Sequence, residues 1–380
     1  MLDIKKLSYW EKKSFFDGID FLIIGAGIVG YSTAIYLRNL NKDAKIVILE
    51  RGYLPSGASS KNAGFACFGS ATELISDLQT IPEKEVWKTV ALRWKGLQKL
   101  KSLLGESNLE LIVNGSWDLI VKTDTKLYDE TIEKMDYLNR KTEEITGINS
   151  VYSIDNQNYK KFGLQNIHSS IYNKLEGQID TAKMNDTFYK KAVANNISVL
   201  FGIEAKEISS VENSVLTVTN IGEIHSSKVA VCTNGFAKQF FPKEDVQPAR
   251  AQVLITKPIK DLKIKGTFHY DSGYYYFRNI DNRILLGGGR NLAFEEETTT
   301  ELENSNLILN KLHELLKNVI LPETNYEIDY NWAGIMGVGT SKKPIIKQMK
   351  ENIYCGIRLG GMGVAIGTLV GEELAELMGE

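Results

Sequence analysis

Apolar residues follow two different periods along this chain. Residues 19–24 (IDFLII) form a continuous apolar run, which is typical of a parallel strand buried on both faces. A glycine-rich loop follows, then helical periodicity through about Asn39 and a second apolar run at 45–50 (KIVILE). This order predicts a strand, a helix and a second parallel strand, a unit of about thirty residues.

Later segments show both helical and alternating patterns. Helical periodicity predicts helices at 83–104, 124–146, 181–195 and 300–317. Alternation and short apolar runs predict strands near 204–220, 229–233, 250–256, 266–278 and 283–289. Residues 109–121 (LELIVNGSWDLIV) predict a hairpin that turns at Asn114-Gly115. The chain closes with a glycine cluster at 360–363 and a helix to about Met378.

The order of these elements predicts two interleaved domains. At 380 residues, the chain exceeds what one hydrophobic core usually supports. We expect an α/β domain with a Rossmann-like parallel sheet, discontinuous over residues 1–95, 171–245 and 331–380. A substrate domain with an antiparallel sheet, from residues 96–170 and 246–330, is inserted into it.

Composition narrows the class of protein. Charged residues make up 24% of the chain and the net charge is −2, so nothing favours nucleic acid as a partner. No apolar run reaches the ~18 residues that span a bilayer, and no signal peptide is predicted. The cysteines (Cys67, Cys232 and Cys355) and the four histidines are widely spaced, which argues against disulfides and metal sites. We therefore expect a soluble, cytoplasmic protein without a metal.

The first loop carries a dinucleotide-binding fingerprint, Gly25-Ala26-Gly27-Ile28-Val29-Gly30. Gly25 permits the tight turn, Gly27 lets the backbone approach a pyrophosphate, and Gly30 lets helix and strand pack closely. The helix N-terminus then directs free N–H groups at the phosphates. Glu50 lies twenty residues beyond Gly30, where a carboxylate accepts hydrogen bonds from ribose hydroxyls. Strand, glycines, helix, second strand and acid all occur in order, so the signal is specific.

The segment after Glu50 favours FAD over NAD. Residues 51–70 (RGYLPSGASSKNAGFACFGS) are small, polar and glycine-rich. Such a backbone can wrap a large ligand closely, and Ser59, Ser60 and Asn62 offer hydrogen bonds to it. A simple NAD domain would usually continue with an ordinary helix and strand.

At these motifs the sequence resembles the D-amino-acid oxidase (DAO) superfamily, in the branch of glycine oxidase, sarcosine oxidase and γ-glutamylputrescine oxidase. The resemblance spans nearly the whole chain. Besides the fingerprint and Glu50, it is carried by Ser56–Gly64, Gly177–Asp180, Gly202–Ala205, Val229–Gly235 and Arg358–Gly363. It implies a DAO-like fold of the glutathione-reductase-2 type and an FAD-dependent oxidoreductase.

The resemblance also implies a set of cofactor contacts. The residues expected to hold FAD are Gly25, Gly27, Ile28, Val29, Gly30, Glu50, Arg51, Ser59, Ser60, Asn62, Ala63, Gly64, Ala205, Thr233, Asn234, Gly235, Arg358, Gly360, Gly361, Met362, Gly363 and Val364. In the resembling enzymes the last glycine loop and its helix face the N1–C2=O edge of the flavin, where the helix dipole stabilises the reduced ring. We expect non-covalent FAD, because the neighbours of Cys67 match no attachment motif.

The substrate site is less clearly marked in the sequence. Resembling enzymes place a tyrosine of the strand near 275 against the substrate, which points to Tyr275 or Tyr276 and leaves both open. Arg358 is a candidate partner for a substrate carboxylate. One departure matters, because the family's carboxylate-binding arginine corresponds to Met336 here. This departure favours a larger or secondary amine unless Arg358 substitutes.

The resemblance implies oxidation of a C–N bond of a small amine or amino acid, with hydride transfer to flavin N5. Oxygen or an electron carrier would then be the acceptor. Two alternatives remain open at this point. One is an FAD-dependent 2-hydroxy-acid (C–O) dehydrogenase, and the other is a non-catalytic flavoprotein.

Overall fold

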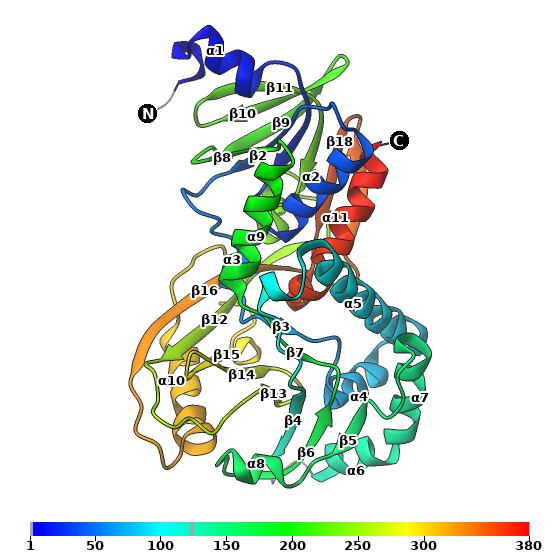
Figure 1. Cartoon of the computed structure of the whole chain (residues 1–380), viewed down its shortest axis with the longest axis vertical. Helices are drawn as coiled ribbons and strands as arrows, with labels where there is room; N and C mark the ends of the chain where they lie inside the picture. Colours follow the sequence, from blue (N-terminus) through cyan, green and yellow to red (C-terminus); the bar gives the residue numbers. More distant parts are fainter. Residues whose placement is uncertain (1–2, 122–124, 380) are drawn as a thin grey trace.

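The computed structural model describes residues 3–121 and 125–379. Two eight-stranded sheets lie end to end along the long axis of the molecule (Figure 1). The upper sheet has the order β17-β18-β11-β1-β2-β8, with β10 and β9 added beside β11. Its parallel strands are β1 (Ile19–Ile24), β2 (Ile46–Glu50), β8 (Ser198–Phe201), β11 (Gly222–Val231) and β18 (Ile353–Ile357). Its antiparallel strands are β9 (Ala205–Val211), β10 (Ser214–Thr219) and β17 (Ile345–Lys350).

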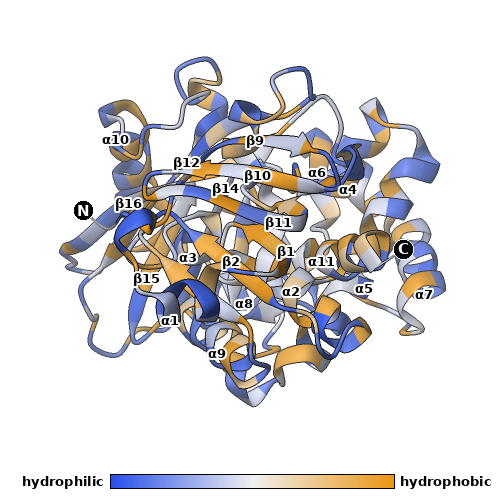
Figure 2. Ribbon diagram, turned by 90° about the horizontal axis from the view of Figure 1, so that it is seen from above, coloured by the Kyte–Doolittle hydropathy of each residue, from blue (hydrophilic) through white to orange (hydrophobic). Residues whose placement is uncertain are grey.

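Helices α2 (Ile28–Leu40) and α11 (Gly363–Gly379) pack side by side against this sheet, whose central strands β1 and β2 are mainly hydrophobic (Figure 2). A Cβ atom at Gly371 would lie 2.4 Å from Cβ of Ser32, so glycine is what permits this close approach. Near the start of α11, Gly367 faces Ile28 at the start of α2 in the same way. The N-terminal ends of the two helices therefore lie next to each other. The two glycine loops that precede the helices lie close together for the same reason.

The lower sheet has the order β16-β12-β15-β14-β13-β4-β6-β5. Neighbouring strands are antiparallel except β4 and β13, which are parallel. The strands are β4 (Ser116–Val121), β5 (Tyr152–Ile154), β6 (Ile167–Asn173), β12 (Gln247–Thr256), β13 (Thr267–Tyr270), β14 (Tyr275–Ile280), β15 (Arg283–Gly288) and β16 (Ile328–Val338). One face packs on α10 (Asn306–Leu315) through a core that includes the stacked rings of Phe268 and Phe277.

The remaining elements lie around these two sheets. They are α1 (Tyr9–Glu11), α3 (Ala58–Lys61), α4 (Ala71–Thr80), α5 (Glu83–Leu104), α6 (Thr125–Glu133), α7 (Met135–Thr146), α8 (Asn158–Lys161) and α9 (Thr181–Ala194), with a small sheet of β3 (Phe65–Ala66) and β7 (Gly177–Gln178). The predicted helix 124–146 is thus two helices, and residue 124 lies outside the described residues. Within residues 3–121 and 125–379, no helix combines the length and apolar character needed to cross a membrane.

The predicted hairpin at 109–121 is wrong. β4 begins only at Ser116 and pairs with β6 and β13, whereas Ile112 makes a single bridge to Gln178. Gly115 has φ of +84°, and a Cβ atom there would lie 2.0 Å from the Tyr172 ring. The glycine therefore serves a close approach between distant segments, not a two-residue turn.

The observed sheets refine the predicted domain boundaries. Those at 171 and 331 fall inside β6 and β16, which pair only with strands of the lower sheet. β16 pairs with β12 along almost its whole length, so it cannot be divided between domains. We propose the same two-domain division with both strands assigned to the substrate domain.

Candidate active site

One cavity of about 1100 Å³ lies between the two sheets. Its upper wall comes from both glycine loops, Gly25–Val29 and Arg358–Ala365, and from the segment that follows β2. Its lower wall comes from the face of the lower sheet opposite α10, including Tyr276, Gly334 and Met336. This cavity therefore extends from the fingerprint to the inserted domain.

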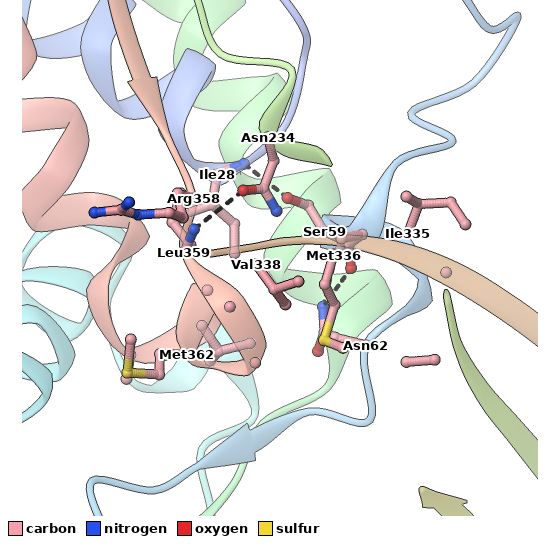
Figure 3. A pocket seen from close by; sticks show the side chains of 18 of the residues that line it. Ile28, Ser59, Asn62, Asn234, Ile335, Met336, Val338, Arg358, Leu359 and Met362 are labelled. Carbon is pink, nitrogen blue, oxygen red and sulfur yellow. Dashed lines mark hydrogen bonds between the residues drawn. The ribbon is translucent and has the colours of Figure 1, made fainter. Parts of the chain in front are cut away.

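The fingerprint end has the features that a nucleotide requires. The Ile28 N–H at the start of α2 donates to Ser59 Oγ at 3.0 Å (Figure 3). The N-terminus of α2 therefore already binds one oxygen acceptor, at the position where a phosphate oxygen is expected. Glu50 is buried at the end of β2, and its two carboxylate oxygens accept from the Ala26 and Gly52 amides at 3.1 and 3.0 Å. The Arg51 guanidinium stacks on the Phe236 ring at 3.8 Å. These contacts orient groups suited to a ribose and a base.

Most of the predicted cofactor residues border this cavity. They are Gly25, Gly27, Ile28, Val29, Glu50, Arg51, Ser59, Asn62, Ala63, Gly64, Ala205, Thr233, Asn234, Arg358, Gly360, Gly361, Met362, Gly363 and Val364. The other three, Gly30, Gly235 and Ser60, contact other parts of the protein. A Cβ atom at Gly30 would lie 1.9 Å from Gly25 O, and one at Gly235 would lie 2.3 Å from Met336 O. The Ser60 hydroxyl donates to Gly57 O at 3.0 Å.

The closing glycine loop has the geometry of a cradle. Gly363 begins α11 with φ of −54°, and apart from its chain neighbours and its own helix no atom of the described residues lies within 4 Å of a Cβ atom built on it. Gly361 is nearly as open, since only Met336 Sδ approaches, at 3.9 Å. The backbone does not require glycine at Gly363, so the missing side chain leaves room for a ligand that lies against the loop. The loop therefore fits the close approach of a flat ring such as a flavin.

The structure separates the two candidate tyrosines. Tyr276 lines the cavity and meets the Phe65 ring edge-on, with ring centroids 5.5 Å apart. Tyr275 points to the other face, where it is 2% exposed in the core beneath α10. Burial raises the pKa of Tyr276 to about 12, so its hydroxyl stays protonated at neutral pH. Tyr276 is therefore the member of the pair that can meet a substrate.

The Arg358 guanidinium is paired with Asp245, which argues against the substrate role predicted for it. It donates to Asp245 Oδ2 at 2.6 Å, to Lys343 O at 2.8 Å and to Ser341 Oγ at 3.4 Å. Figure 3 shows its side chain extending away from Met336. Arg358 borders the cavity, but its guanidinium is already engaged by these partners. Met336 lies in the wall as the sequence suggests, so neither position offers a cation to a substrate.

A buried polar cluster in the wall was not predicted from the sequence. Glu176 is fully buried and accepts from the Phe68 and Gly69 amides at 2.7 and 2.9 Å and from Ser116 Oγ at 2.5 Å. His269 Nε2 lies 3.7 Å from Glu176 Oε2. Burial alone would lower the pKa of His269, but Glu176 outweighs it and raises that pKa.

Cys67 adds a thiol to this cluster. Within the described residues, Cys67, Glu176 and His269 are grouped with ligand atoms inside 4.8 Å of one another. Glu176 already accepts three hydrogen bonds, so we interpret the group as a buried ion pair and not as a metal site. The pair holds the Phe68–Gly69 backbone that follows β3. No periodic pattern marks Glu176, because it lies in the turn between β6 and β7.

These features define a two-domain flavoprotein. A βαβ unit with its acid, a second glycine loop at the start of α11, and one cavity facing an inserted sheet match the requirements of FAD and not of a nicotinamide nucleotide alone.

The chain belongs to the FAD-dependent oxidoreductase (DAO) family, whose model matches residues 20–377. FAD is therefore the cofactor. Probable oxidoreductase OrdL of Haemophilus influenzae is 21% identical to this chain, with 94% of this chain and 82% of the relative aligned. Gamma-glutamylputrescine oxidoreductase of Escherichia coli is 22% identical, over 94% and 83% of the two chains.

Solved structures show the same fold. Glycine oxidase from Geobacillus kaustophilus superposes with a TM-score of 0.76 at 16% identity, over 94% of each chain. L-proline dehydrogenase from P. horikoshii superposes with a TM-score of 0.74 at 19% identity, over 96% of this chain and 94% of that one. The likeness confirms the predicted combination of a Rossmann-like domain with an inserted antiparallel sheet.

Proposed function

We propose that this protein oxidises a CH–NH or CH–NH2 bond of a small amine or amino acid. FAD, when bound, supplies the hydride acceptor at N5. The relatives support this donor class, because their names refer to γ-glutamylputrescine, glycine and L-proline. The substrate would lie against the lower-sheet wall of the cavity, beside Tyr276 and Met336.

The observation that favours C–N over C–O chemistry is the state of the ionisable groups there. His269 Nε2 faces the buried Glu176 carboxylate at 3.7 Å, so it is engaged with Glu176 and not positioned as a base toward a substrate. Tyr276 stays neutral because burial raises its pKa. Removing the hydroxyl proton of a 2-hydroxy acid calls for a general base, whereas an amine needs only to be in its neutral form. The wall is therefore better suited to an amine.

Anaerobic reduction tests the proposal. The purified holoprotein is mixed with matched pairs of amino and 2-hydroxy acids, and with simple amines, while flavin absorbance is followed. Bleaching by amino compounds alone is expected. Bleaching by 2-hydroxy acids alone would replace the proposal with C–O oxidation, and no bleaching by any donor would point to a non-catalytic flavoprotein. Peroxide formation on admitting air would identify oxygen, and not a carrier, as the acceptor.

Two further features belong to this proposal. Burial raises the pKa of the Cys67 thiol well above its ordinary value, which keeps it protonated and a weak nucleophile and so supports non-covalent FAD. Release of the flavin on acid precipitation would test this. The three free cysteines support a reducing compartment such as the cytoplasm.

A further inference from the structure

Outside the nucleotide end, the charged side chains that line the cavity are mostly paired. Each of five cations has an acid within ion-pair distance. The pairs are Arg93 with Glu73, Lys342 with Asp77, Lys343 with Glu85, Arg358 with Asp245, and His269 with Glu176. Arg51 lies at the nucleotide end beside Glu50. The two lining cations that remain in the described chain are Lys61 and Arg290.

Arg290 differs from the five paired cations because it has no ion-pair partner among the described residues. It lines the cavity just after β15, its Nε atom is buried, and no hydrogen-bond partner for that atom is found in the described residues. Its guanidinium lies over the Phe294 ring, 4.9 Å from the centroid, which holds the planar group without neutralising it. Burial lowers the pKa of Arg290, and the nearby Glu297 charge offsets this only in part.

The nearest acid is already engaged. Both Glu297 oxygens accept from Arg250, at 2.8 Å each, and Gln252 donates to the same carboxylate at 2.9 Å. Glu297 is completely buried in this arrangement. It is therefore paired with Arg250 and forms no ion pair with Arg290.

The backbone fixes where Arg290 stands. Gly288 and Gly289, just before it, have φ of +119° and +83°. A Cβ atom at Gly288 would lie 2.1 Å from Tyr274 O, so the chain packs closely against the segment before β14 there. The arginine thus leaves the sheet at a fixed point on the cavity wall that also carries Tyr276.

We propose that Arg290 binds a carboxylate of the substrate, with Lys61 as a second cation on the same wall. This inference builds on the proposed amine oxidation and makes the substrate a carboxylate-bearing amine. The planar guanidinium matches a carboxylate in a two-pronged geometry, and an anionic ligand would compensate the buried charge. A simple diamine fits poorly, because the acids on this part of the described wall are already paired.

Ligand binding tests the subsite without turnover. The FAD-loaded protein is titrated with propionate and with propionamide, and binding is measured by calorimetry and by the flavin absorption spectrum. Propionate should bind and the uncharged amide should bind at least about tenfold more weakly. Arg290→Met should weaken propionate binding by about 30-fold or more, with Arg290→Lys in between.

Arg140→Met is the matched control, since Arg140 also lies over an aromatic ring, that of Tyr137, but outside the cavity lining. It should leave propionate binding unchanged. Equal affinity for propionate and propionamide in the unaltered protein, or unchanged propionate binding in FAD-loaded Arg290→Met, would overturn the subsite. If propionate binds through Arg290 while no amine reduces the flavin, the proposed function fails and the anion site stands. If amines reduce the flavin but propionate does not bind, the anion site fails and the proposed function stands.

Discussion

Asn234 Oδ1 accepts a hydrogen bond from the Leu359 amide at 3.1 Å, joining two cavity segments that lie 125 residues apart (Figure 3). Asn234 follows β11 with φ of +47°, a conformation that asparagine tolerates better than most residues. Leu359 immediately precedes the closing glycine loop. The bond therefore couples the turn that borders the nucleotide half of the cavity to the loop that borders the flavin half.

Asn234→Gly should weaken FAD binding. Glycine keeps the positive φ and removes only the side-chain acceptor, so the expected loss is that of one partly buried hydrogen bond, about 1–2 kcal/mol. The dissociation constant for FAD, measured by fluorescence titration, reports it. Asn352→Gly is the control, because Asn352 also has positive φ (+61°) but lies in a turn between β17 and β18. Equal FAD affinity in both variants would contradict a coupling role.

Gly363→Ala should separate cofactor binding from folding. Alanine favours the first turn of α11 by ~0.5–1 kcal/mol, so the FAD-free protein should unfold at slightly higher urea concentration. The added methyl would occupy space left for the flavin and should weaken FAD binding by about 1–3 kcal/mol.

Gly367→Ala should behave in the opposite way. A Cβ atom there would lie 2.7 Å from Ile28 Cγ2, so the change should destabilise the FAD-free fold itself. Urea unfolding with and without excess FAD distinguishes the two variants. FAD affinity that is unchanged in Gly363→Ala would contradict the cradle assigned to the closing loop.

The features of the site that sequence reasoning found are those made by neighbouring residues. Gly25, Gly30 and Glu50 act within one βαβ unit, so their spacing is enough to place them. The alternation of β14 likewise gave the two faces on which Tyr275 and Tyr276 lie, although not which face meets the cavity. That choice depends on α10, which covers one face of the lower sheet.

Long-range pairing accounts for what was missed. The direction of the Arg358 side chain is decided by Asp245, 113 residues away, and Arg290 lacks an ion-pair partner because Arg250 engages Glu297. Neither partner is marked by periodicity or spacing. Gly115 was assigned to a hairpin because Asn-Gly favours a tight turn locally, whereas the approach of Tyr172 decides its role.

The His269–Glu176 pair should make stability depend on pH. The pKa of His269 is raised in the fold from its ordinary value of 6.5, so its contribution is fully present below about that pH and is lost as pH rises through the folded pKa. The free energy of unfolding should therefore fall over this interval. His269→Gln should flatten that part of the curve, as measured by urea unfolding at several pH values. A parallel curve in the variant would show that other groups cause the dependence.

Glu176 contributes at the acid end of the same curve. Burial alone would raise its pKa, but the partners His269 and Ser116 outweigh burial, so the pKa lies below its ordinary value of 4.5. Its contribution is present above that value and is lost as pH falls through the folded pKa. The pair should therefore be most stabilising between the two ordinary values, roughly pH 4.5–6.5.

Tyr276→Phe should reduce turnover while Tyr275→Phe should not. The two residues are adjacent in β14, and both changes remove one hydroxyl, but only Tyr276 lines the cavity. If the Tyr276 hydroxyl contacts the substrate, its loss should lower kcat/KM for the best amine donor by about tenfold. Tyr275→Phe acts in the core beneath α10 and should change the free energy of unfolding instead. Stopped-flow reduction of the flavin under anaerobic conditions measures the first effect, and urea unfolding measures the second. An equal fall in reduction rate for both variants would mean that β14 acts on the site through the packing of its sheet, since only Tyr276 can reach a substrate directly.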